Sequence, residues 1–323
     1  MTIKAIRVHK TGGPEVLQYD DVELAAPAAG QVRVRNKAIG LNFVETYFRS
    51  GLYPVSLPFT LGSEAAGIVE AVGEGVTNLK VGDRVAYNSG GAYAEATNVP
   101  AIRALPLPDA VSFEVAATLL LKGATAEYLL RRTFRVEPGQ TILWHAAAGG
   151  VGLIATQWAK HLGCTVIGTV GTDEKAALAR AHGCDHVINY RSENVAERVK
   201  EITAGRKVPV VYDGVGKDTF LASLDCLAPR GLLVSFGNAS GPVTGVDLGI
   251  LAAKGSLYVT RPTLATYAAT NEDYAEIGKN VFDVVAKGAV KVQINQHYKL
   301  ADAAQAHRDL EARKTTGATI LVP

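Results

Sequence analysis

The stretch most able to carry chemistry is residues 140–163, which read QTILWHAAAGGVGLIATQWAKHLG. Its first part, Thr141–Trp144, is a short apolar run typical of a buried strand, and apolar side chains recur at helical spacing after the glycines. Between the two lies an A-x-G-x-x-G pattern. In a strand, turn and helix of this kind, small residues let the backbone approach a pyrophosphate, which the N–H groups of the helix start bind. The stretch therefore predicts a dinucleotide site.

Each small residue has its own part in this prediction. Ala147 stands where the usual pattern has its first glycine, Gly149 permits close approach of the phosphate, and Gly152 permits close packing of helix against strand. Gly150 and Val151 complete the predicted phosphate loop. A strand-to-helix turn without a ligand is the alternative, because short glycine patterns also arise by chance.

The elements around this loop favour the nucleotide-binding interpretation. Apolar runs alternate with helical patterns through the middle of the chain, and the expected strands are residues 141–144, 165–170, 186–190, 208–212, 232–236 and 256–260. Six such strands with helical crossovers predict an α/β fold with a doubly wound parallel sheet. Its ligand is expected at the carboxyl ends of the strands.

Composition excludes several classes of function. At 323 residues the chain is long for one hydrophobic core, so two domains are expected. The net charge is +2, and no basic stripe indicates a nucleic-acid partner. The start MTIKAIRVHK has no apolar signal segment, and no apolar run reaches about 18 residues. Cys164, Cys184 and Cys226 show no C-x-x-C spacing, which disfavours disulfides and cysteine-rich zinc sites. We expect a cytoplasmic protein without a membrane partner.

The remaining residues differ in pattern from this middle segment. Residues 3–9, 31–38 and 67–72 are short alternating segments broken by glycine and proline, which is typical of a small antiparallel sheet or barrel. Helical patterns begin after residue 112, and we expect a domain border near Lys122. The end of the chain reads as helix, strand, helix and strand and most simply returns to the first domain. The expected domains are residues 1–122 with 262–323, and a nucleotide-binding domain at residues 123–261.

Several motifs together resemble the zinc-free quinone oxidoreductases, also called zeta-crystallin-like, of the medium-chain dehydrogenase/reductase superfamily. The resemblance covers the whole chain and is carried by IGLNF (39–43), RSGLYP (49–54), GSEAAG (62–67), KVGDRV (80–85), HAAAGGVG (145–152), INYR (188–191), VSFGN (234–238) and GSLYVTRP (255–262). It implies a GroES-like, β-rich catalytic domain built from both chain ends, a Rossmann domain that binds NADP between them, and an active site in the cleft.

Zinc-dependent relatives hold their metal with a cysteine and a histidine at the positions that this sequence matches with Asn42 and Ser63. Neither residue is a usual zinc ligand, and a catalytic zinc needs three protein ligands. We therefore expect no metal, which argues against alcohol dehydrogenation and for an acceptor that is already electrophilic. Glu64, retained beside Ser63, is expected to be either a catalytic acid or a carboxylate buried against a backbone or basic partner.

NADPH is the expected cofactor. NAD-specific sheets place an acid about 20 residues after the glycines, but here Asp173 comes slightly late and fits better as the N-cap of the next helix. The resemblance implies that Lys175, Tyr190 and Arg313 surround the 2′-phosphate, which two cations and a hydroxyl would suit. A solvated helix charge for Lys175 and a surface ion pair for Arg313 are the alternatives.

The resemblance also implies the residues around the rest of the cofactor and the substrate. Asn42, Tyr47, Tyr53 and Arg261 are assigned to the nicotinamide or substrate, and Asn42 is counted in both sets. Cofactor contacts are further assigned to Thr125, Gly171, Phe236, Gly237 and Asn238. Asn42 could instead cap a helix at residues 43–48, Tyr53 could be a packed loop aromatic, and Thr125 could serve helix packing.

These features predict an NADPH-dependent quinone reductase that transfers a hydride from nicotinamide C4 to a small quinone. One alternative is a reductase of α,β-unsaturated aldehydes or ketones that uses the same site. Another is a cofactor-binding protein with a structural or weak RNA-binding role, against which the scattered charges argue. An apolar, β-branched edge strand at residues 256–260 predicts a homodimer, as the resemblance also implies.

Overall fold

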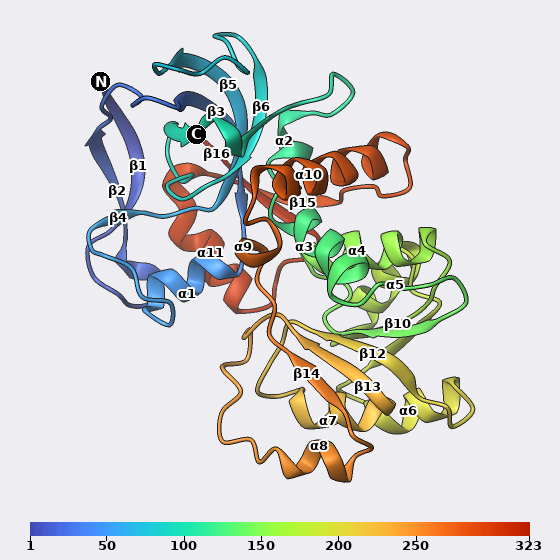
Figure 1. Ribbon diagram of the computed structural model, residues 1–323. Helices are drawn as coiled ribbons and strands as arrows, with labels where there is room; N and C mark the ends of the chain where they lie inside the picture. Colours follow the sequence, from blue (N-terminus) through green and yellow to red (C-terminus); the bar gives the residue numbers. More distant parts are fainter. The chain divides into compact units, whose positions relative to one another are not determined.

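The computed structural model describes residues 1–323, which divide into two compact units (Figure 1). Unit 1 comprises Met1–Ala124, Thr270–Ala286 and Val292–Pro323, and unit 2 comprises Thr125–Ala269 and Lys287–Lys291. Unit 1 is thus assembled from both ends of the chain. The functional domain borders at 122/123 and 261/262 stay a prediction. No helix combines the length and the hydrophobicity that crossing a membrane requires.

Unit 2 is organised around a six-stranded parallel sheet in the order β11-β10-β9-β12-β13-β14. The strands are β9 (Thr141–Trp144), β10 (Thr165–Val170), β11 (His186–Asn189), β12 (Val208–Asp213), β13 (Leu227–Ser235) and β14 (Tyr258–Thr260). The order reverses direction beside β9, the first strand, as in doubly wound folds that bind a dinucleotide at this point. The predicted fold of this segment is confirmed. The strand expected at residues 232–236 is longer, because β13 already begins at Leu227.

Helices connect these strands or flank them in sequence, and side-chain caps explain where several of them begin. They are α3 (Lys122–Tyr128), which crosses into unit 1, the π-helical turn η3 (Leu129–Thr133), α4 (Gly150–His161), α5 (Asp173–Ala181), α6 (Val195–Ile202), α7 (Phe220–Cys226), α8 (Gly249–Ala253) and α9 (Leu264–Tyr267). The side chains of Thr172, Asn194 and Thr263 cap the helices that follow them by accepting a backbone hydrogen bond. Leu143, Ile167, Val211 and Leu233 are fully buried in the core on one side of the sheet.

Unit 1 holds two sheets that are mainly antiparallel. The smaller has the order β2-β1-β4, and the larger has the order β15-β16-β3-β5-β6-β8, with β7 also paired to β3. The strands are β1 (Thr2–Val8), β2 (Leu17–Glu23), β3 (Gln31–Leu41), β4 (Phe59–Thr60), β5 (Glu64–Val72), β6 (Arg84–Asn88), β7 (Ala96–Pro100), β8 (Ala104–Pro106), β15 (Ile294–Lys299) and β16 (Ala318–Val322). Register shifts at Arg33/Val34 and Asn36/Ala38 bend β3, which pairs in turn with β7, β5 and β16.

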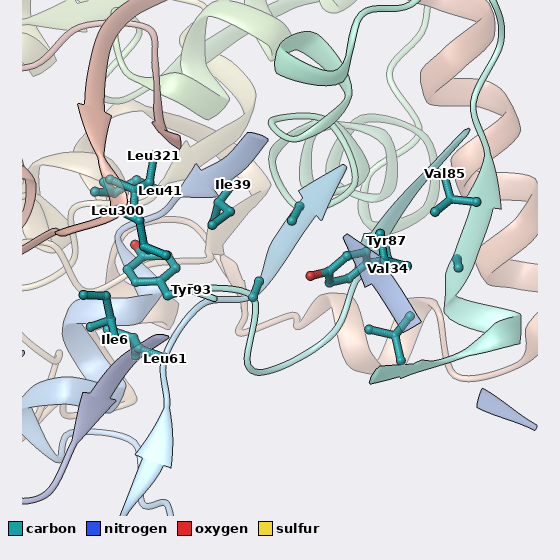
Figure 2. Close-up of a cluster of buried hydrophobic side chains, with 14 of the residues drawn as sticks. Ile6, Val34, Ile39, Leu41, Leu61, Val85, Tyr87, Tyr93, Leu300 and Leu321 are labelled. Atoms are coloured by element: carbon teal, nitrogen blue, oxygen red, sulfur yellow. The ribbon is translucent and has the colours of Figure 1, made fainter. Parts of the chain in front are cut away.

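The core of unit 1 lies between these strands and its helices (Figure 2). The helical elements are η1 (Pro14–Val16), α1 (Val44–Ser50), η2 (Ala101–Arg103), α2 (Phe113–Ala116), α10 (Asn271–Ala286), η4 (Leu300–Asp302) and α11 (Ala303–Glu311). Ile6, Ile39 and Leu321 are at most 1% exposed, and Figure 2 shows Tyr87 and Tyr93 among the same buried side chains. The Tyr87 hydroxyl contacts Asn36 and the Tyr93 hydroxyl contacts His307, so these buried polar groups have hydrogen-bond partners.

Candidate active site

The predicted phosphate loop joins β9 to α4 in unit 2. Gly149 is the N-cap of α4, and its N–H donates to the Ala146 carbonyl at 2.9 Å. A Cβ at Gly152 would lie 2.5 Å from the Ala146 oxygen and 2.6 Å from the Ala147 oxygen, so no side chain fits there. The first N–H groups of α4 have no intrahelical acceptor and can bind an anion. The loop therefore has the backbone approach and the free donors that a pyrophosphate needs.

The residues predicted at the adenosine end lie at the carboxyl edge of β10 and β11. A Cβ on Gly171 would come within 2.5 Å of the Tyr190 hydroxyl, so the Tyr190 side chain lies against the Gly171 backbone. Lys175 is half-buried in the first turn of α5, and its N–H donates to the Thr172 hydroxyl oxygen at 3.3 Å. Arg313 belongs to unit 1, where it adopts a φ of 59° just after α11. The structure thus brings Gly171, Tyr190 and Lys175 to one edge of the sheet.

The helix cap predicted at this edge was wrong. Thr172, not Asp173, is the N-cap of α5, because the Thr172 hydroxyl lies within reach of the first-turn N–H while Asp173 is already helical. Asp173 instead accepts a hydrogen bond from the Asn189 side chain at 3.1 Å. Its carboxylate therefore has a partner within the sheet edge.

The residues predicted at the nicotinamide end of unit 2 gather at the end of β13. A Cβ on Gly237 would lie 2.3 Å from the Gly214 oxygen, so two backbones meet closely here. The Phe236 ring lies 5.5 Å from the Trp144 ring. Arg261 donates to the Ser235 carbonyl at 2.8 Å and, with the Asn238 amide turned to satisfy both of its groups, to Asn238 at 3.1 Å. Arg261 thus holds the turn that carries Phe236, Gly237 and Asn238. Thr125 is half-buried on α3 and is not part of this group of contacts.

In unit 1, the predicted substrate residues Asn42, Tyr47 and Tyr53 lie before, within and after α1. Asn42 is 6% exposed and Tyr47 is 8% exposed, and Tyr53 follows the end of the helix. The Tyr47 and Tyr53 rings pack edge to face with centroids 5.2 Å apart, and the Tyr53 N–H donates to the Tyr47 carbonyl at 3.1 Å. The two tyrosines therefore lie together, and their assignment to the substrate stays a prediction.

Asn42 does not cap α1 through its side chain, so that alternative is wrong. The carboxylate of Glu45, in the first turn of the helix, instead accepts the Asn42 backbone N–H at 2.6 Å. The Asn42 amide makes only long contacts of 3.4 Å, to Gly40 and to Glu45. Sequence reasoning missed Glu45, although the Asn-x-x-Glu spacing was a signal for it.

Glu45 lies in a buried cluster with Ser63, Glu64 and Lys122. Burial is the main cause that raises the pKa of Glu45 from 4.5 to about 7; Glu64 raises it further, whereas the Ser63 hydroxyl, Lys122 and the Asn42 N–H lower it. Glu64 is fully buried, and its two oxygens accept from Lys122 Nζ at 2.9 Å and from the Leu121 N–H at 2.8 Å. The expected pairing of Glu64 with a backbone and a basic partner is confirmed. Both oxygens of this carboxylate are therefore occupied.

Comparison with known proteins identifies the class. Residues 28–109 match the family described as "Alcohol dehydrogenase GroES-like domain", and residues 150–283 match the family described as "Zinc-binding dehydrogenase". Together with the parallel sheet, these matches define a member of the medium-chain dehydrogenase/reductase superfamily, with a GroES-like and a Rossmann domain.

Full-length relatives narrow this class. The chain is 59% identical to the quinone oxidoreductase of Pseudomonas aeruginosa, with 99% of each chain covered. Its sequence is 56% identical to that of Escherichia coli quinone oxidoreductase, whose crystal structure was solved as a complex with NADPH. The two structures have a TM-score of 0.98, over 99% of this chain and 100% of that one. The chain belongs to the quinone oxidoreductase family. A 2-haloacrylate reductase from a Burkholderia species is 45% identical, again with 99% of each chain covered.

The zinc in one family description does not fit the residues present here. Asn42 and Ser63 are neutral and are not usual zinc ligands, and Glu64 is held by Lys122 and Leu121. No group of three or more His, Cys, Asp or Glu side chains is arranged to hold a metal. The phosphate loop, by contrast, fits a dinucleotide.

Proposed function

We propose that this chain is an NADPH-dependent quinone reductase that reduces its acceptor by direct hydride transfer without a metal. The observation that carries the proposal is the phosphate loop, which is closed to any side chain at Gly152. It occurs in a chain whose zinc-ligand positions hold Asn42 and Ser63. The relative solved with NADPH supports the same cofactor.

When bound, NADPH supplies a hydride from its nicotinamide. The N–H groups at residues 150–152 would bind its pyrophosphate, and Gly149, whose own N–H is held by Ala146, would allow the close approach. Lys175, Tyr190 and Arg313 would bind its 2′-phosphate. The backbone at Ala147 and Gly171 would lie along the dinucleotide. The remaining proposed contacts, toward the nicotinamide, come from Asn42, Thr125, Phe236, Gly237 and Asn238.

Asn42, Tyr47, Tyr53 and Arg261 are proposed to orient the quinone and to exclude water. A quinone gains aromatic character on reduction, so its oxygens can take protons from solvent after hydride transfer. The side chains then act mainly by positioning, and no nucleophile or obligatory acid is needed.

Steady-state rates with a panel of quinones, each with NADPH and with NADH, test this function. We expect turnover of simple quinones and a preference for NADPH. Absence of quinone turnover in protein that binds NADPH would reject the acceptor, and absence of NADPH binding would reject the cofactor.

A second candidate acceptor is an α,β-unsaturated carbonyl compound, favoured by the likeness to the 2-haloacrylate reductase. The same panel should include enones and a haloacrylate. A kcat/KM for an enone well above that for every quinone would make this second function the primary one.

We also propose a homodimer formed through β14. This strand ends the parallel sheet and pairs only with β13, and Tyr258 and Val259 on it are 61% and 40% exposed. A bare apolar edge favours pairing with a second copy across a two-fold axis. Light scattering should give twice the 34.0 kDa chain mass, and Val259→Lys should shift it toward the monomer. A 34.0 kDa mass at micromolar concentration would reject the dimer.

A cytoplasmic location belongs to the same proposal. It is supported by three buried free cysteines, which a reducing compartment keeps as thiols. Cell fractionation would test it. No nucleic-acid partner is proposed.

A further inference from the structure

A chain of buried polar side chains runs under the phosphate loop of unit 2. Thr169, His145, Ser223 and Asp213 are each at most 2% exposed, and we call them the His145 relay. His145 Nδ1 lies 2.9 Å from the Thr169 hydroxyl, and His145 Nε2 lies 3.0 Å from the Ser223 hydroxyl. Ser223 then donates to Asp213 Oδ2 at 2.9 Å. The relay therefore links β10, the residue after β9, α7 and the end of β12.

The partners of Asp213 orient this relay. Its Oδ1 accepts the N–H groups of Val215 at 2.8 Å and Gly216 at 3.0 Å, and its Oδ2 accepts the Thr219 hydroxyl at 2.7 Å beside that of Ser223. Ser223 gives its single hydroxyl hydrogen to that carboxylate and must accept from His145. In the neutral ring the hydrogen of His145 is then on Nε2, and Nδ1 accepts from the Thr169 hydroxyl. Burial, only partly opposed by Asp213, lowers the pKa of His145, which agrees with this neutral form.

Both ends of the relay hold loops at the edge of the sheet where the dinucleotide is expected. Ala146, next to His145, adopts a φ of 53°, a left-handed conformation that is unfavourable for a residue other than glycine. The Ala147 N–H donates to the Thr169 carbonyl at 3.0 Å, so Thr169 contacts this loop through side chain and backbone. At the other end, Asp213 holds the turn that carries Gly214.

The position of these two loops matters because their neighbours leave no room for adjustment. Gly152 faces the carbonyls of Ala146 and Ala147, and Gly237 faces the carbonyl of Gly214, all at distances that exclude a side chain. A small rotation of either loop would therefore move the backbone groups that the cofactor must meet. Apolar packing could fill the same volume, but hydrogen bonds between buried groups also fix direction.

We propose that His145 is a positioning residue for the dinucleotide, because its two ring nitrogens tie the phosphate loop to the β12 turn in one hydrogen-bonded arrangement. This inference rests on the proposed function. His145 belongs neither to the residues proposed to contact the nicotinamide nor to those proposed to bind the 2′-phosphate. The part of the cofactor concerned is common to NADPH and NADH, so the relay should serve both equally.

Direct binding measurements on the full-length protein test this proposal. Thr169→Val removes one relay hydroxyl at nearly constant volume, and Thr169→Ser keeps it as the matched control. Ser223→Ala removes the central hydroxyl. We expect Thr169→Val and Ser223→Ala to raise the Kd of NADPH and the Kd of NADH by similar factors, about threefold to tenfold. The Kd values of Thr169→Ser should stay close to those of the unmodified protein. KM for the quinone at saturating NADPH should not change.

Unchanged nucleotide affinity in variants that keep their circular dichroism spectrum would overturn the proposal, as would a loss confined to NADPH. Failure of the unmodified protein to bind either nucleotide would overturn the proposed function as well, which separates the two cases.

Histidine NMR gives an independent readout. In ¹⁵N-histidine-labelled protein, the signal lost in His145→Gln should show hydrogen on Nε2 only and should not titrate between about pH 5 and 8. A hydrogen on Nδ1, or titration in this range, would contradict the relay.

Discussion

Replacing Lys122 by methionine should destabilise unit 1 strongly. The Lys122 side chain is 6% exposed and that of Glu64 is 0% exposed, and their charged atoms lie 2.9 Å apart. Without the ammonium, Glu64 keeps only the Leu121 N–H as partner, and Glu45 lies in the same buried cluster. Breaking a buried pair from one side typically costs about 3 to 5 kcal/mol. We expect a loss of that size in the free energy of unfolding.

The loss should also depend on pH. Lys122 lowers the pKa of Glu45, which burial has raised to about 7, so its removal moves that pKa higher. A carboxyl whose pKa is raised in the folded state contributes stability that is lost as pH rises from its unfolded value through its folded value. With Lys122 gone, this window extends upward, and the deficit at about pH 8 should exceed the deficit at about pH 6.

Urea unfolding at these two pH values measures both effects. Lys80→Met is the control, because that side chain is 86% exposed and should change stability by no more than about 0.5 kcal/mol. The double variant Glu64→Gln with Lys122→Met should lose less than the sum of its parts, since it leaves no unpaired charge on Glu64. A loss below about 1 kcal/mol for Lys122→Met would refute the reasoning, because it would mean that the pair is solvated.

Four further outcomes are expected. Lys175→Ala should raise the Kd of NADPH about tenfold to a hundredfold and leave the Kd of NADH nearly unchanged, and Lys200→Ala is the control. Equal losses of affinity for both nucleotides would mean that Lys175 acts through folding or through the pyrophosphate. Tyr53→Phe and, separately, Tyr47→Phe should each lower kcat/KM for a simple quinone by at most about tenfold. A fall of about a thousandfold in kcat/KM, with intact cofactor affinity, would instead identify that tyrosine as an obligatory proton donor. Burial, and after it the Arg49 charge, lowers the pKa of His307 from 6.5 to about 3, so the free energy of unfolding should fall as pH drops below 6.5. Between about pH 7 and 5 the unmodified protein should lose roughly 2 kcal/mol more of this free energy than His307→Gln does. Equal losses would contradict a buried neutral histidine. Elemental analysis of dialysed protein should find far less than one zinc per chain, and a stoichiometric value would overturn the metal-free proposal.

The parallel sheet was predictable because its information is local. Buried strands such as Thr165–Val170 are short runs of mainly small or β-branched residues, and a helical pattern separates each from the next. The small residues of the phosphate loop were recognisable for the same reason, since Gly152 answers a steric demand between neighbours in sequence.

Features that depend on distant contacts were less accessible. Asp173 and Thr172 are both good capping residues, and only the backbone geometry at the end of β10 decides between them. The pairing of Glu64 with Lys122 joins residues 58 positions apart, so the sequence indicated a partner without identifying it. The His145 relay joins four separate segments, and no spacing rule connects them.

The position of β16 has a consequence for synthesis on the ribosome. This strand, residues Ala318–Val322, lies inside the large sheet of unit 1 between β15 and β3, and Ile320 and Leu321 on it are fully buried. Strand β3 is synthesised before unit 2, but its neighbour β16 is synthesised after it. Unit 2 lies in the middle of the chain and can complete its sheet first, while the N-terminal strands wait with an apolar edge uncovered. Removing residues 318–323 should therefore damage unit 1 more than unit 2.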